Sequence, residues 1–186
     1  MNRFDYWYVN DFFNNKDRKK ISSFIEKNYN NVEDIKSQAR NDNGQTKKKT
    51  KTLMIDWKKI KPLTYDLESK IYDINENVFG YTLNGFNNLS VVLLNIYKSS
   101  EKGEYDWHYD FSDSTTFDTK LTVLVNLSES YEGGDFLLFQ GKQITVQEFK
   151  PGTLLLFKSY INHKVTPVTK GVRKTLTMFC HGPKFQ

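Results

Sequence analysis

The second half of the chain is divided into short strand-like runs by closely spaced turn residues, and this punctuation limits the possible folds. Most runs are rich in β-branched and aromatic residues, and Gly or Pro separates many of them from the next. The runs occupy residues 89–97, 104–111, 120–127, 135–140, 143–149, 153–157, 164–168 and 174–179. In one run, Leu121, Val123, Val125 and Leu127 alternate onto one face. Eight short strands with regular turns predict an all-β sandwich or barrel.

The first half of the chain has helical periodicity. Asn10 or Asp11 can cap a helix whose apolar stripe continues to about Asn28. Pro62 is expected to open a second helix, and Gly80 is a natural stop for it because glycine adopts the left-handed conformation that often ends helices.

The chain has 186 residues, a length that suits one domain. We expect residues 1–88 to form a helical supporting region, packed on a strand-rich core of residues 89–186. Within the first region, residues 53–57 are predicted to form a short strand. The polar, turn-rich residues 41–50 are predicted to form a mobile loop.

Composition excludes several classes of protein. The single cysteine, Cys180, rules out an internal disulfide framework and a multi-cysteine zinc site, and we expect it to be buried. The net charge of +5 comes mainly from short Lys-rich runs in the first half, which favour a solvated surface over a nucleic-acid interface. No apolar run is long enough to span a membrane and no signal peptide is evident, so a cytoplasmic protein of a bacterium or phage-infected cell is expected.

Histidine chemistry must come from three residues, His108, His163 and His181. His108 and Asp110 stand two apart, so on a strand their side chains share one face. With a further histidine, either His163 or His181, they can form the facial triad of non-haem Fe(II) oxygenases, which leaves metal positions open. Asp106 also stands two residues from His108 and is the rival carboxylate.

A candidate carboxylate-binding group follows at a fixed spacing. Arg173 stands ten residues after His163, at the start of the last predicted strand. A guanidinium binds a carboxylate through two parallel hydrogen bonds. Inside a barrel and near an open metal site, Arg173 suits a dicarboxylate co-substrate.

These motifs together resemble the Fe(II)/2-oxoglutarate-dependent dioxygenases, specifically the prolyl 4-hydroxylase-like branch, over about residues 89–182. The segments that carry the resemblance are His-x-Asp at 108–110, Tyr-Glu-Gly-Gly-Asp-Phe at 131–136, Pro-Gly-Thr-Leu-Leu-Leu-Phe at 151–157 and the stretch from His to Arg at 163–173. The resemblance implies a mainly β fold with N-terminal helices, whose core is a double-stranded β-helix (a jelly roll, as in cupins).

The resemblance also implies roles for individual residues. His108, Asp110 and His163 would bind Fe(II), with Asp110 favoured over Asp106. Residues implied to contact 2-oxoglutarate are Arg173, Tyr97 and Thr177. Dioxygen would be the other co-substrate and ascorbate a reductant, and each turnover would release succinate and CO2.

Some of these assignments have competing interpretations. Tyr97 can equally be a core tyrosine, and Thr177 an ordinary strand residue. Asn126 falls near the position where some relatives carry a tyrosine on the co-substrate, so a second anchor is not assigned. His181 is expected beyond the last strand, exposed and without a role.

The expected substrate is a peptidyl prolyl or similar residue, with a free amino acid or small molecule as the alternative. AlkB-type nucleic-acid demethylases share this kind of site, but they usually carry a second arginine six residues after the anchor, where this chain has Phe179. A cupin-like binding module without turnover is the non-enzymatic alternative. The sequence predicts no oligomeric state.

Overall fold

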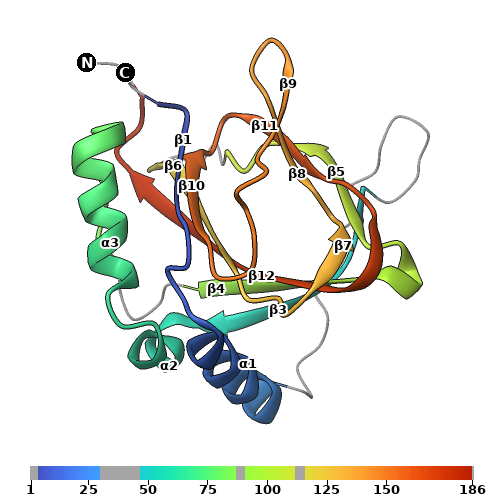
Figure 1. The fold of residues 1–186 in the computed structure, drawn as a ribbon. Coiled ribbons are helices and arrows are strands. Elements are labelled where there is room, and N and C mark those ends of the chain that lie inside the picture. The colour runs from blue at the N-terminus through green and yellow to red at the C-terminus, as the bar shows by residue number, and fades with distance from the viewer. Residues whose placement is uncertain (1–3, 30–46, 87–90, 112–115, 186) are drawn as a thin grey trace.

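The computed structural model describes residues 4–29, 47–86, 91–111 and 116–185, and two facing antiparallel sheets dominate it (Figure 1). The strands of the larger sheet are β1 (Tyr6–Val9), β3 (Lys51–Asp56), β4 (Val91–Lys98), β6 (Asp118–Asn126), β7 (Tyr131–Gly133), β10 (Leu154–Lys158) and β12 (Val168–Gly182). Those of the smaller sheet are β2 (Lys48–Lys49), β5 (Glu104–His108), β8 (Phe136–Phe139), β9 (Gln143–Thr145) and β11 (Asn162–Val165). The larger sheet has the order β1-β10-β6-β12-β4-β3, with β7 also on β12, and the smaller has the order β2-β5-β11-β8-β9.

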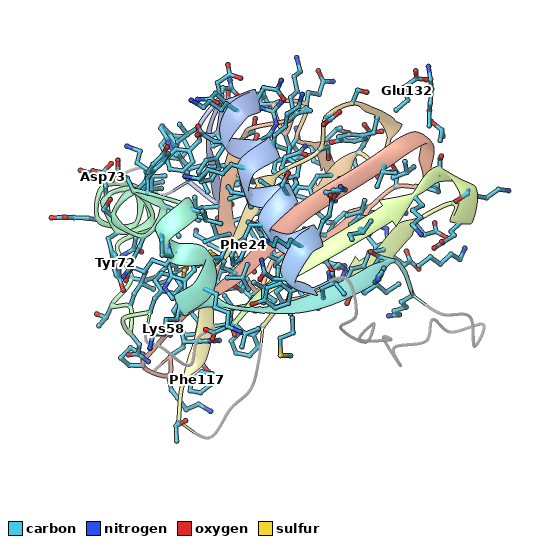
Figure 2. The ribbon with its side chains drawn as sticks, turned by 90° about the horizontal axis from the view of Figure 1, so that it is seen from below. Phe24, Lys58, Tyr72, Asp73, Phe117 and Glu132 are labelled. Atoms are coloured by element: carbon cyan, nitrogen blue, oxygen red, sulfur yellow. The ribbon has the colours of Figure 1, made fainter. Side chains whose placement is uncertain are left out.

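Helices cover the outer face of the larger sheet. They are α1 (Asn15–Tyr29), α2 (Trp57–Ile60) and α3 (Leu67–Ile74), with 3-10 turns η1 (Lys61–Leu63) and η3 (Ser99–Glu101) and a π-helical turn η2 (Asn75–Phe79). Figure 2, seen from below, shows α1 lying across the strands of this sheet. No helix among the described residues is long and apolar enough to cross a bilayer.

Strand alternation divides the core in two. Leu121, Val123 and Val125 of β6 point to the helices and join the core on that side, as their spacing predicts. Leu124 points the other way, into the space between the sheets, where a second core forms. Cys180 of β12 is buried on the helical side, as expected, and its burial raises the pKa of its thiol to about 12.

The predicted helix boundaries are partly wrong. The cap of α1 is Asn14, whose side-chain oxygen accepts a hydrogen bond from the backbone N–H of Asp17 at 3.0 Å, and not Asn10 or Asp11. The helix predicted from Pro62 is interrupted, because η1 and α3 are separate elements before η2 ends at Gly80. Gly80 does end it in the left-handed conformation, with φ +73°.

The predicted strands also need correction. Gly171 falls between the predicted runs 164–168 and 174–179, but it lies within the long strand β12, with a φ of +73° and paired with Tyr131 of β7. Arg173 therefore lies inside the last strand and not at its start. Part of the predicted loop, residues 41–46, lies outside the described residues, whereas Lys48–Lys49 form β2. Strands β1, β2 and β7 and helix α2 were not predicted.

Candidate metal and co-substrate site

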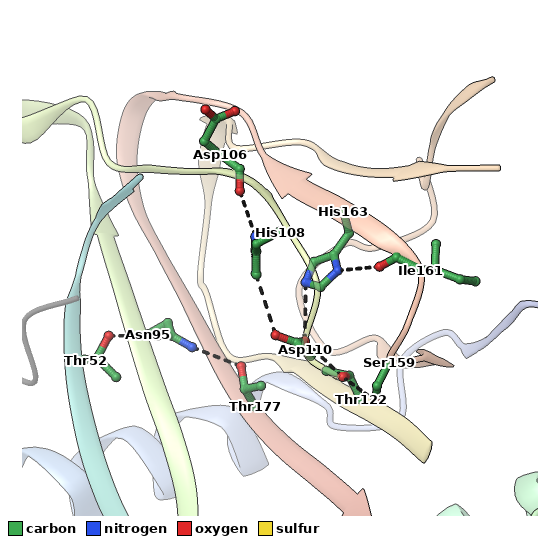
Figure 3. Close-up of polar contacts among 10 residues, drawn as sticks. All are labelled: Thr52, Asn95, Asp106, His108, Asp110, Thr122, Ser159, Ile161, His163 and Thr177. Carbon is green, nitrogen blue, oxygen red and sulfur yellow. Dashed lines mark hydrogen bonds and ion pairs between the residues drawn. The ribbon is translucent and has the colours of Figure 1, made fainter. Parts of the chain in front are cut away.

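Two histidines and one aspartate meet between the sheets. His108 ends β5 and lies directly opposite His163 of the paired strand β11. Asp110 Oδ2 is 3.3 Å from His163 Nε2, and Asp110 Oδ1 is 3.7 Å from His108 Nε2. One ligand atom from each residue lies within 4.8 Å of the others, a set that could hold a metal ion. Figure 3 shows the three side chains pointing toward one another.

Backbone carbonyls orient both imidazoles. His108 Nδ1 lies 2.7 Å from the carbonyl oxygen of Asp106, and His163 Nδ1 lies 3.0 Å from that of Ile161 (Figure 3). Each Nδ1 carries the proton when it donates these bonds, so in the neutral imidazole Nε2 keeps the lone pair. Such outer-shell bonds fix the tautomer and direction of metal-binding histidines.

Asp110 and Asp106 differ sharply in position. Asp110 belongs to the predicted strand run 104–111 but lies just beyond the end of β5, and its N–H donates to the Ser159 carbonyl at 3.1 Å. Its Oδ2 accepts a hydrogen bond from Thr122 Oγ1 at 2.9 Å. The carboxylate of Asp106 instead accepts the N–H of Trp107, away from the imidazoles. The structure therefore brings Asp110, and not Asp106, to the two histidines.

The local electrostatics suit a cation. Burial, followed by the neighbouring His163, lowers the pKa of His108 to about 3, so this imidazole is neutral near pH 7 and its Nε2 lone pair can bind a metal. Burial alone would raise the pKa of Asp110, but His163, His108 and Thr122 outweigh it and hold this pKa below its usual value. Asp110 is therefore an anion at neutral pH.

A cavity of about 120 Å³ lies between the sheets beside these ligands, and its other lining residues include Arg173. The Arg173 side chain is only 1% exposed and lies between two rings, 5.1 Å from the centroid of Tyr97 and 5.3 Å from that of Phe149. Gly134 packs against its stem, since a Cβ there would meet Arg173 Cδ at 2.9 Å. This contact explains why a glycine occupies position 134 in the Tyr-Glu-Gly-Gly-Asp-Phe motif.

Arg173 lacks an anion among the described residues. Its Nε and Nη2 atoms are buried and have no hydrogen-bond partner there, and neither has the nearby hydroxyl of Thr175, which lines the same cavity. A buried charge without a partner is strongly unfavourable. The cavity therefore suits a small anion that would satisfy both groups.

Tyr97 and Thr177 also line this cavity. Burial raises the pKa of Tyr97 to about 12, against the opposing charge of Arg173, so its hydroxyl stays protonated. The hydroxyl of Thr177 accepts a hydrogen bond from Asn95 Nδ2 at 3.0 Å, and Asn95 Oδ1 accepts another from Thr52 (Figure 3). Strand parity places Tyr97, Asn95 and Thr177 on the inner face. The pairing of β4 with β12 is what brings the side chains of the two strands together.

Other predictions have mixed outcomes. Asn126 is buried but donates to the Tyr131 hydroxyl and the Phe149 carbonyl, at 3.0 and 3.2 Å, outside the cavity lining. His181 was expected to be exposed beyond the last strand, which is wrong: it lies within β12, partly buried beside Thr119. Phe179 lines the cavity.

Three further residues at the site were not singled out from the sequence for these positions. They are Thr122, Asn95 and Lys48. Alternation along each strand gives their face, but their neighbours depend on strand pairing between distant segments. Tyr105 also lines the cavity, and its ring stacks on His108.

Comparison with known proteins agrees with this geometry. Residues 92–181 match the model of the 2OG-Fe(II) oxygenase superfamily. These residues belong to that superfamily. A PKHD-type hydroxylase of Synechococcus sp. (strain CC9605) is 38% identical over 80 residues, which are 41% of this chain and 36% of that protein. The chain thus matches about a third of the length of this curated relative.

The fold of several solved structures is similar to this one over nearly the whole chain. A prolyl hydroxylase in complex with a hypoxia inducible factor peptide fragment, from Trichoplax adhaerens, has a TM-score of 0.71 and 19% identity, covering 95% of this chain and 83% of its own. SnoK, a non-heme alpha ketoglutarate dependent carbocyclase from nogalamycin biosynthesis, has a TM-score of 0.70 and 14% identity, covering 95% and 79%. At these identities the likeness concerns the fold, and it confirms the predicted jelly-roll class.

Proposed function

We propose that this protein is an Fe(II)- and 2-oxoglutarate-dependent dioxygenase that hydroxylates a C–H bond, releasing succinate and CO2. The observation that carries the proposal is one cavity that holds both a His108–Asp110–His163 cluster and a buried arginine without an anion. The cluster alone, or the buried arginine alone, could be explained by a role in stabilising the fold. Together they match the two ligands that this reaction requires.

The metal would be held by His108 Nε2, His163 Nε2 and Asp110 Oδ1 or Oδ2. Three protein ligands would leave the metal open to the co-substrates. Bound Fe(II) would supply the activation of dioxygen, with 2-oxoglutarate as the source of two electrons. One oxygen atom enters succinate and the other enters the hydroxylated product. Ascorbate would be the reductant that keeps the metal as Fe(II). We also propose that the protein acts in the cytoplasm.

The carboxylate of 2-oxoglutarate that is remote from the metal would bind Arg173. Nε and Nη2 form one edge of the guanidinium, which can donate two parallel hydrogen bonds to a carboxylate. Thr175 would donate a third bond, and Tyr97 and Thr177 would border the chain of the ligand. The ligand would thus satisfy the buried polar atoms that lack partners in its absence.

The proposed substrate is a peptidyl prolyl or similar residue. The similarity to hydroxylases, including a prolyl hydroxylase with a bound peptide, supports this choice. A free amino acid or small molecule is the second candidate, because a carbocyclase from nogalamycin biosynthesis has the same fold with a similar TM-score. Phe179, in place of a second arginine, makes the cavity less suited to a demethylase of nucleic acids.

The test is turnover of 2-oxoglutarate by the purified protein. We expect succinate only when Fe(II), 2-oxoglutarate and O2 are all present, with faster release when the substrate is added. Proline-containing peptides, free amino acids and methylated oligonucleotides can be screened by mass spectrometry for a gain of one oxygen or a loss of a methyl group. Fe(II) binding without any succinate would favour the cupin-like binding module and refute the enzyme.

A further inference from the structure

A second cation, Lys48, lines the cavity that contains the metal-binding cluster. It lies in β2, whose pairing with β5 sets Lys48 directly opposite Tyr105. The ammonium lies 5.1 Å from the centroid of the Tyr105 ring. That ring stacks on the imidazole of His108, with centroids 3.4 Å apart and 14° between the planes. The lysine charge and the imidazole of His108 therefore both lie close to the Tyr105 ring.

The adjacent lysine has a different environment. Side chains alternate along a strand, so Lys48 and Lys49 point to opposite faces of β2. Lys49 is exposed and forms an ion pair with Glu104 on the neighbouring strand. Two lysines that are adjacent in sequence thus differ in position: one lines the cavity and the other joins a surface ion pair.

The two cations of the cavity lie at different depths. Arg173 belongs to the larger sheet and is fully buried, whereas Lys48 belongs to the smaller sheet and is only partly buried. A ligand that arrives from solvent would meet a lysine and an aromatic ring beside the metal, before it reaches the buried arginine.

We propose that Lys48 is a specificity-determining residue that binds a carboxylate of the prime substrate. This inference rests on the proposed function, in which the buried arginine is reserved for 2-oxoglutarate. A lysine binds an anion as a flexible point charge, which suits a group held at a cavity entrance. The carboxylate would hold the substrate with its reacting C–H bond near the metal.

Two sources can supply this carboxylate. One is the α-carboxylate of a free amino acid or of a peptide C-terminus. The other is an Asp or Glu side chain next to the target residue within a peptide. Both present the same chemistry to Lys48, and matched probes can separate them.

The experiment compares acids with their amides on protein loaded with Mn(II) and 2-oxoglutarate. The probes are N-acetyl amino acids, proline included, and blocked Ala-Pro-Asp peptides, each against its amide or Asn counterpart. Binding is measured by thermal shift and calorimetry. We expect at least one acid to bind roughly tenfold more tightly than its amide, as a charge-assisted hydrogen bond provides. The pair that shows the preference identifies the source.

Variants of the two lysines complete the test. Lys48→Met should remove the preference, Lys48→Arg should retain it, and the matched control Lys49→Met should leave it unchanged. The KM for 2-oxoglutarate in uncoupled turnover with Fe(II) should be the same in all four proteins. No preference in the unmodified protein, or a preference that survives Lys48→Met, would overturn the inference.

Two further outcomes separate this inference from its premise. A rise in the KM for 2-oxoglutarate in Lys48→Met alone would assign the lysine to the co-substrate and overturn its role in specificity. Absence of succinate from the unmodified protein would refute the proposed enzyme. The acid preference measured with Mn(II) would still test the role of Lys48 independently.

Discussion

The two ends of the cavity differ in how completely their polar atoms are paired. At the end with the two histidines and Asp110, backbone carbonyls accept from both histidine Nδ1 atoms, and Asp110 accepts from Thr122. At the opposite end, Arg173 Nε and Nη2 and the Thr175 hydroxyl are buried without partners among the described residues. The first end is organised before any ligand arrives. The second is incomplete until an anion binds.

This difference has an energetic meaning. Outer-shell hydrogen bonds at the metal end hold the ligand atoms in place, so little reorganisation accompanies binding of a metal. At the arginine end, the folded protein bears the penalty of a desolvated charge, which packing between Tyr97 and Phe149 reduces only in part. Binding of a carboxylate would remove that penalty, so 2-oxoglutarate should stabilise the fold.

Removing a metal ligand should have the largest effect. We expect Asp110→Ala to lower succinate release at least about a thousandfold, because loss of the one anionic ligand removes several kcal/mol of metal-dependent catalysis. Metal content by mass spectrometry should fall in parallel.

The matched control is Asp106→Ala. Its carboxylate accepts the Trp107 N–H away from the histidines, while its backbone carbonyl, which orients His108, is retained. Turnover should stay within about twofold, as for most surface substitutions. Loss of activity in this variant and not in Asp110→Ala would reverse the assignment of the ligand.

Replacing the buried arginine should have the next largest effect, and a different one. We expect Arg173→Met to raise the KM for 2-oxoglutarate at least about thirtyfold, since breaking a buried charge pair costs about 2–5 kcal/mol. Metal binding should change little. The thermal stabilisation that 2-oxoglutarate gives to the Mn(II)-loaded protein should disappear, and an unaltered KM would show that another group anchors the co-substrate.

Sequence alone predicts much of this arrangement, because strand alternation is a local property. The period of two assigns Arg173, Thr175 and Thr177 to one face of β12, and all three line the cavity. The spacing of His108 and Asp110 predicts neighbouring side chains, and they are neighbours although Asp110 lies past the end of β5. Their roles as ligands remain predictions.

Other features depend on contacts between distant segments. Lys48 enters the cavity only because β2 pairs with β5, and a two-residue strand in a polar stretch has no periodicity to detect. Gly171 has the usual sequence signal of a turn, yet pairing on both sides keeps it within β12. Asp106 and Asp110 have equal spacing from His108, so spacing alone does not distinguish them. The family resemblance favours Asp110, and its contacts with Ser159 and Thr122 hold it beside the histidines.

Isosteric substitutions of two threonines should each affect one end of the cavity and leave the other unchanged. Thr122→Val removes a hydrogen bond from Asp110, the proposed anionic ligand of the metal. We expect it to weaken metal affinity about ten- to hundredfold, the usual effect of losing an outer-shell partner, with no change in the KM for 2-oxoglutarate at saturating metal. Fe(II) or Mn(II) titration measures the affinity.

Thr175→Val is the counterpart at the arginine end and should have the smallest effect. One neutral hydrogen bond contributes about 0.5–1.5 kcal/mol, so the KM for 2-oxoglutarate should rise about two- to tenfold while metal affinity stays constant. Because the Thr175 hydroxyl is unpaired when buried, its removal should not lower the melting temperature of the ligand-free protein. A destabilised ligand-free variant would mean that this hydroxyl already has a partner, and the contrast between the two ends would then rest on Arg173 alone.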